Sequence, residues 1–124
     1  LVMNGTADPV IPYQGGIASF HGIGAAGEVQ AMEGTISHWK AVNGIARTDP
    51  GEVRELPDRV VEDGSTVRLV RFVSPDGKQV VAYHILGGGH AIPGGYRALP
   101  DFVFGPINHD VNGADEIWSF FFAR

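Results

Sequence analysis

Apolar residues recur along the chain with two different periods, and these periods predict both helices and strands. Between residues 28 and 42 the large apolar side chains are spaced by three and four positions, which places them on one face of a helix. They are Val29, Met32, Ile36, Trp39 and Val42. Asn43 and Gly44 follow directly and are typical of a helix C-terminus. We therefore expect a helix over residues 28–42.

Two later segments, residues 66–73 and 79–86, are rich in β-branched side chains and are separated by Ser-Pro-Asp-Gly-Lys. Asp-Gly between two such runs predicts a β-hairpin. The second run, QVVAYHIL, is apolar almost throughout, which is typical of a strand buried on both faces. The shorter apolar run at residues 1–3 predicts a further strand.

The remaining segments complete an alternating order of elements. Residues 7–16 contain two prolines and two glycines and predict an ordered loop, residues 45–64 are polar and irregular, and residues 91–111 predict a long loop. A closing helix is expected after Asn112, which can cap it. Its expected buried face consists of Ile117, Phe120 and Phe121. The order of strands and helices predicts an α/β protein with a mostly parallel sheet and flanking helices.

Composition narrows the class of protein. The chain has 124 residues, of which 44% are hydrophobic and 19% charged, and we expect residues 1–124 to belong to one domain. The net charge is −5, and acidic and basic residues are intermixed through residues 47–71 without a basic stripe, which argues against a nucleic-acid partner. No apolar run approaches the roughly 20 residues of a membrane span. Without cysteine there is neither a disulfide nor a thiolate nucleophile.

Two motifs that could indicate a cofactor or a metal lack their required context. GIGAAG at residues 22–27 matches the spacing G-x-G-x-x-G, but the preceding PYQGGIASFH is no buried strand, so a glycine-rich loop is favoured over a dinucleotide site. The five histidines form no H-x-x-x-H pair, and we expect no metal and no cofactor. His38 and His84 are expected on the surface or as hydrogen-bonded core residues.

Asp8 and His90 are the candidates for chemistry. Each follows an apolar strand and lies in a loop bounded by glycine or proline, NGTADP for Asp8 and LGGGHAIPG for His90. In open α/β sheets, reactive groups collect beyond the carboxyl ends of the strands. A histidine base requires a carboxylate that orients its ring, so we predict a hydrogen bond of roughly 2.6–3.2 Å between the two side chains. From the residues alone, the alternative remains that both segments are structural turns without a role in acid–base chemistry.

Four segments resemble one family in the same order along the chain. NGTADPVIPYQGG, SHWKAVNG, VVAYHILGGGHAIPGG and NGADEIWSFFFAR resemble the acid loop, a later helix, the histidine strand and loop, and the last helix of one group of α/β-hydrolases. This group contains polyhydroxybutyrate depolymerases, feruloyl esterases and acetylxylan esterases. The resemblance implies that Asp8 is the acid and His90 the base of a Ser-His-Asp triad, and that the protein is secreted or periplasmic.

The nucleophile of such a triad is not in this sequence. None of the five serines lies in the G-x-S-x-G frame that the family uses. They are Ser19, Ser37, Ser65, Ser74 and Ser119. Because the chain begins within an apolar run at Leu1, we expect it to be the C-terminal part of a longer protein, with the serine and the oxyanion hole upstream. The 124 residues alone are then expected to be inactive.

The resemblance leads to an expectation of a carboxylic ester hydrolase. The expected substrates are polyester oligomers or acylated and feruloylated carbohydrates, and the expected partner is the upstream part of the same chain. Two alternatives remain open: a non-catalytic remnant or binding module, and a peptidase or carbohydrate deacetylase on the same fold.

Overall fold

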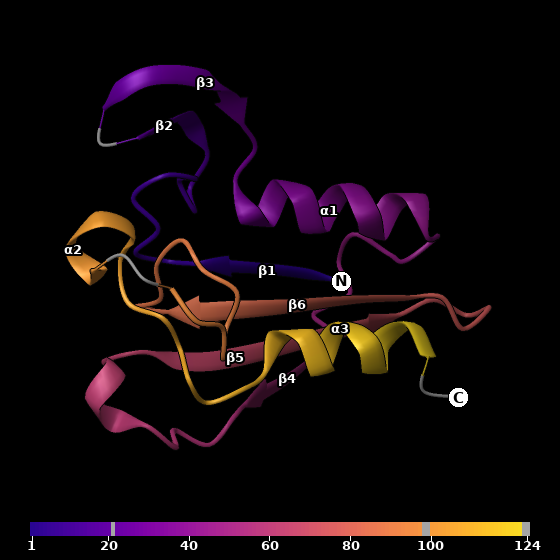
Figure 1. Ribbon diagram of the computed structural model, residues 1–124. Coiled ribbons are helices and arrows are strands. Elements are labelled where there is room, and N and C mark those ends of the chain that lie inside the picture. Colours follow the sequence, from indigo (N-terminus) through magenta and orange to yellow (C-terminus); the bar gives the residue numbers. More distant parts are fainter. Residues whose placement is uncertain (21, 98–99, 123–124) are drawn as a thin grey trace.

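The computed structural model describes residues 1–20, 22–97 and 100–122 and contains a four-stranded sheet, a separate two-stranded hairpin and helices on both faces of the larger sheet (Figure 1). The strands are β1 (Val2–Gly5), β2 (Gly16–Phe20), β3 (Ile23–Val29), β4 (Glu52–Glu55), β5 (Thr66–Val73) and β6 (Gln79–Leu86). The helices are α1 (Met32–Val42), a 3-10 turn (Val61–Asp63), the short α2 (Asp101–Phe104) and α3 (Gly113–Phe122).

The strand order in the larger sheet is β1-β6-β5-β4, so β1 forms one edge of it. β1 pairs with β6 in parallel, whereas β6 with β5 and β5 with β4 pair antiparallel. The expectation of an α/β architecture is therefore confirmed, but the expectation of a mostly parallel sheet is wrong. The physical reason is the tight turn at residues 74–78, which forces its two strands to run in opposite directions.

Alternate side chains of β6 serve two separate apolar clusters, one on each face of the sheet. Val80 and Ala82 pack in a cluster with Met32 and Ile36 of α1. On the opposite face, the cluster contains Val67, Val81, Tyr83 and Ile85, and Phe120 of α3 packs against it. Residues 80–85 of β6 are all buried, as the apolar run predicted.

Several elements differ from the sequence expectations. α1 begins at Met32 rather than residue 28, because Glu28 and Val29 pair with β2 in the β2–β3 hairpin. GIGAAG lies in the turn and second strand of this hairpin rather than in a turn between a buried strand and a helix N-terminus, which excludes the dinucleotide geometry and also corrects the expected loop. The irregular segment 45–64 contains β4 and the 3-10 turn, and the long loop 91–111 contains α2.

The expected buried face of α3 is also partly wrong. Phe120 faces the sheet, but Ile117 is 37% exposed and Phe121 is 66% exposed. The hydrogen bond from Tyr83 to Glu116 fixes which side of the helix meets β6. Asn112 caps the helix as expected, since its Oδ1 accepts the main-chain N–H groups of residues 114 and 115.

A buried carboxylate, Asp110, ties the segment before α3 to the connection between β4 and β5. One of its oxygens accepts the N–H groups of Arg59 and Val60, at 2.6 and 3.2 Å, and the other accepts the side-chain amide of Asn108 at 2.9 Å. Burial opposes ionisation of this carboxyl, but the three hydrogen bonds outweigh it and lower the pKa of Asp110 below its usual value. The ionised form therefore stabilises the fold.

We expect Asp110→Asn to lower the free energy of unfolding at pH 7 by about 1–3 kcal/mol, because an amide cannot accept hydrogen bonds on both sides. A group whose pKa is lowered by folding stabilises above its unfolded pKa and loses this effect as the pH falls through its folded value. The difference between wild type and variant should thus shrink below about pH 4. Urea unfolding at pH 7, 5 and 3 measures it, with Glu62→Gln at an exposed position as control; a pH-independent difference would contradict the assignment.

Candidate active site

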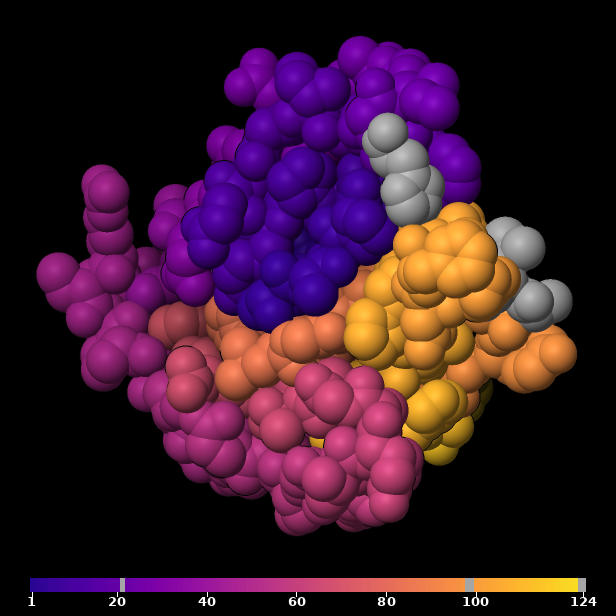
Figure 2. Space-filling model, turned by 90° about the vertical axis from the view of Figure 1, so that its left-hand side faces the viewer, coloured from indigo at the N-terminus to yellow at the C-terminus, as the bar shows by residue number. Residues whose placement is uncertain are grey.

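The loops that follow β1 and β6 bring Asp8 and His90 together. Because β1 and β6 are parallel neighbours, their carboxyl ends lie at the same edge of the sheet. Seen from that end, the N-terminal segment and the segment beyond β6 lie against each other (Figure 2). His90 Nδ1 is 2.9 Å from Oδ2 of Asp8, within the range expected from the sequence.

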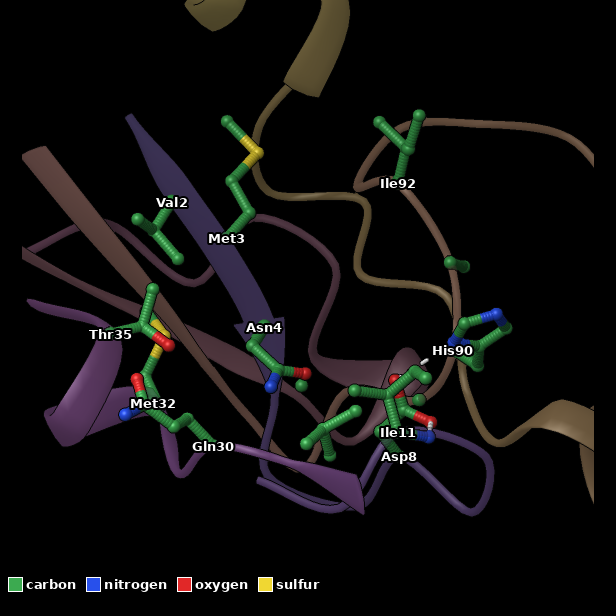
Figure 3. Close-up of a pocket in the computed structure, with 14 residues that line it drawn as sticks. Val2, Met3, Asn4, Asp8, Ile11, Gln30, Met32, Thr35, His90 and Ile92 are labelled. Carbon is green, nitrogen blue, oxygen red and sulfur yellow. Dashed lines mark hydrogen bonds and ion pairs between the residues drawn. The ribbon is translucent and has the colours of Figure 1, made fainter. Parts of the chain in front are cut away.

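Main-chain donors hold the Asp8 carboxylate in place. Its Oδ1 accepts the N–H groups of Val10 and Ile11, both at 2.8 Å, while its Oδ2 faces the imidazole. When Asp8 is ionised, both of its oxygens act as acceptors and Nδ1 of His90 donates. In the neutral imidazole with this tautomer Nε2 carries no proton, and it points away from Asp8 (Figure 3). The Asp8 side chain is 5% exposed and that of His90 is 42% exposed, so the acid is sheltered while the base is accessible.

Glycines allow the three loops around the pair to approach at main-chain distance. A Cβ on Gly5 would lie 2.2 Å from the carbonyl oxygen of Gly88, and a Cβ on Gly89 would lie 2.2 Å from that of Phe104. The His90 N–H donates to the same Phe104 carbonyl at 2.6 Å. The glycine run is therefore required by close packing of main chain against main chain, in addition to the turn after β6.

A cavity of about 560 Å³ extends from the pair along the unpaired edge of β1 (Figure 3). All four residues of β1 line it, together with Asp8 and His90. Its other walls are largely apolar: Ile11, Val29, Met32 and Ile92 contribute, with Gln30 and Thr35 as polar members. Among the residues that line the cavity, Asp8 is the acidic one and none is a lysine or an arginine.

His84 is a core residue and takes no part in this site. It is 6% exposed and its Nδ1 is hydrogen-bonded to the hydroxyl of Tyr13, which lies in the loop that carries Asp8. Burial lowers the pKa of His84 below its usual value, so the neutral imidazole is favoured. The pair therefore anchors the Asp8 loop to β6. The sequence predicted a hydrogen-bonded core position as one alternative, but no local pattern indicated Tyr13 as the partner.

The other histidines and serines in the described part of the chain do not join the pair. His38 is exposed on α1 and contacts the Trp39 ring, and His21 lies outside the described residues. Ser65 and Ser74 are buried and hydrogen-bonded to aspartates in their own turns. Within residues 1–20, 22–97 and 100–122, no hydroxyl group is hydrogen-bonded to the His90 ring, and no cluster of three or more potential metal ligands occurs.

No family model, curated protein or solved structure matches this chain. None of the helices in the described part of the chain has the length and apolar character needed to cross a bilayer.

One neighbour of His90 could not have been found from the sequence. The Phe104 ring of α2 stacks on the imidazole, with 6.1 Å between the ring centres and 28° between the planes. Phe104 lies in the segment expected to be a long loop, and no motif connects it to His90. Its position results from the approach of Gly89 to the end of α2.

Proposed function

We propose that Asp8 and His90 are the acid and the base of a Ser-His-Asp triad in a carboxylic ester hydrolase of the α/β-hydrolase type. The observation that carries the proposal is the 2.9 Å contact between His90 Nδ1 and an Asp8 carboxylate that two main-chain N–H groups already hold. This arrangement leaves Nε2 free to accept a proton, which is the function of the triad histidine.

The serine of this triad would come from a segment outside these 124 residues, added in parallel beside β1. The free edge of β1 presents main-chain N–H and C=O groups that another strand can bind. A parallel strand there would end beside the carboxyl end of β1, where Asp8 and His90 lie. The turn after such a strand would bring its serine next to Nε2.

Exposed aromatic residues on α3 support the same arrangement. Trp118, Phe121 and Phe122 are each more than 60% exposed, and Phe121 borders a largely apolar groove with Leu1, Val2 and Trp39. Large apolar surface of this kind is typical of an interface. A strand and helix added beside β1 would cover it.

The reaction then follows from the proton positions. Nε2 of His90 accepts the proton of the serine hydroxyl while the serine oxygen attacks the ester carbonyl carbon. Collapse of the tetrahedral intermediate breaks the bond to the alcohol, which takes the proton from the imidazolium. Water attacks the resulting acyl-enzyme with the same histidine as base, releasing the carboxylic acid and restoring the serine. Throughout, Asp8 holds the ring and stabilises its charged form.

The part of the cavity next to His90 favours uncharged esters as substrates, while the added strand would cover the part along the β1 edge. Besides the catalytic pair, the cavity carries no charged side chain among the residues that line it. Polyester oligomers and acylated or feruloylated carbohydrates, the classes implied by the sequence motifs, both fit this condition.

The test is turnover by the complete protein that contains this chain. We expect hydrolysis of p-nitrophenyl esters, short polyester oligomers or feruloylated sugars, together with labelling of one serine by a fluorophosphonate probe. A binding module would give neither result, and a peptidase would be labelled but would prefer amide substrates. Absence of both turnover and labelling would refute the proposal.

A further inference from the structure

Phe104 connects the His90 ring to a second group, the side chain of Arg97. The guanidinium carbon of Arg97 lies 5.3 Å from the centre of the Phe104 ring, within the range of a cation–π contact. The same ring stacks on the imidazole of His90. Arg97 therefore contacts the same side chain that stacks on the proposed base, His90.

Arg97 also binds main-chain carbonyl groups in the His90 loop and at the end of α2. Its Nη2 donates to the carbonyl oxygen of Gly105 at 2.5 Å, and its Nη1 lies 3.4 Å from the carbonyl oxygen of His90 itself. The His90 N–H in turn donates to the Phe104 carbonyl. The guanidinium thus links the loop that carries His90 to the end of α2.

The burial of Arg97 distinguishes it from the other arginines that form ion pairs in the described structure. Its side chain is 14% exposed, whereas the ion-paired side chains of Arg54 and Arg68 are 61% and 48% exposed. Its carboxylate partner Asp101, at 3.0 Å, is 70% exposed. An ion pair with so exposed a partner contributes little by itself. The contacts of Arg97 with the two carbonyl groups and with the Phe104 ring therefore hold its side chain more than the ion pair with Asp101 does.

We propose that Arg97 is a positioning residue that sets the orientation of His90 by clamping the Phe104 ring and the two adjoining loops. The consequence for catalysis rests on the proposed ester hydrolase function, but the clamp itself does not. The planar guanidinium of Arg97 spreads its N–H donors over a fixed fork that reaches two carbonyl groups while it lies on the ring, whereas the ammonium of a lysine concentrates its donors at one point. Loss of the clamp leaves the His90 loop with its main-chain hydrogen bonds and the ring with its contacts to Asp8 and an unclamped Phe104, which allows the ring to turn away from Asp8 more often.

The experiment compares Arg97→Met, Arg97→Lys and Asp101→Asn in the complete protein. The probes are p-nitrophenyl butyrate hydrolysis and the proton NMR signal of the His90 Nδ1–H group. For Arg97→Met we expect kcat to fall by about 10- to 100-fold with KM changed less than about twofold, because a small displacement of a reacting group costs rate rather than binding. The Nδ1–H signal should broaden through faster exchange with water. Arg97→Lys should recover part of both losses.

Asp101→Asn is the matched control, since it removes the exposed partner and leaves the clamp intact; both readouts should stay within about twofold of wild type. Three results would overturn the inference. Asp101→Asn could lower kcat as much as Arg97→Met does, Arg97→Met could change KM alone, or Arg97→Met could leave the Nδ1–H signal unchanged. If Arg97→Met does not fold, Arg97→Lys tests the clamp instead. We then expect an intermediate loss of kcat, and a wild-type kcat and Nδ1–H signal would contradict the clamp. If the wild-type protein hydrolyses no ester, the proposed function fails, while the NMR comparison still decides the clamp.

Discussion

Replacement of His90 by alanine should lower kcat for ester hydrolysis by about four to six orders of magnitude in the complete protein, with a much smaller change in KM. The expected loss is this large because the serine hydroxyl would have no base for its proton and the leaving alcohol no acid. Single-turnover and steady-state rates on a p-nitrophenyl ester measure the effect. A variant that keeps more than about one hundredth of the activity would show that His90 is not the base.

Asp8→Asn tests the other member of the pair and should cost about 10⁴ in kcat. An amide retains the shape of the carboxylate but can offer its NH₂ group to Nδ1, which stabilises the wrong tautomer of the imidazole. His38→Ala is the matched control, since His38 is exposed on α1 and contacts the neighbouring Trp39 ring. Its activity should equal that of the wild type. If Asp8→Asn were as active as this control, the acid would have to be sought elsewhere.

Gly89→Ala should reduce the free energy of unfolding by about 3 kcal/mol or more, a large effect for a single added methyl group. The new Cβ would lie 2.2 Å from the Phe104 carbonyl oxygen and 2.5 Å from the Cα of Gly105, and both of these are main-chain atoms that no side-chain rotation can remove. The His90 loop and the end of α2 would have to separate. Urea unfolding monitored by tryptophan fluorescence measures the loss.

Gly34→Ala is the control of opposite sign. Gly34 lies inside α1, and its new Cβ would meet only the flexible side chain of Gln30, at 3.7 Å. Because alanine favours helix and restricts the unfolded chain, this variant should gain about 0.5–1 kcal/mol. Equal and small effects for the two alanine substitutions would mean that the approach of Gly89 to Phe104 does not constrain the fold.

Local sequence features predicted a large part of the fold. The hairpin of β5 and β6 was predicted with its true bounds, because alternating β-branched residues and an Asp-Gly turn act within a few residues of each other. The C-terminus of α1 and the cap of α3 were predicted for the same reason. β4, α2 and the β2–β3 hairpin were missed, since short polar or glycine-rich segments have no period that distinguishes them from loops.

The face of α3 shows where a correct local pattern still leads to a wrong prediction. Phe120, Phe121 and Phe122 are consecutive, so hydrophobicity alone does not decide which of them faces the sheet. The structure turns Phe120 inward, and Glu116 on the same side binds the hydroxyl of Tyr83. A partner from β6 therefore decided the orientation of a helix that the sequence had correctly predicted.

The sequence by itself determined which residues are available for chemistry. Asp8 and His90 each follow a strand and lie in a loop rich in glycine or proline, and this could be predicted because strand ends and turns are encoded locally. Only the tertiary structure decided that β1 lies parallel to β6, so that the two loops meet at 2.9 Å. It also decided that the Phe104 ring stacks on His90 and that Arg97 lies against this ring, since these contacts form only when α2 packs against Gly89. Contacts between distant segments depend on packing of the whole chain, which no local pattern records.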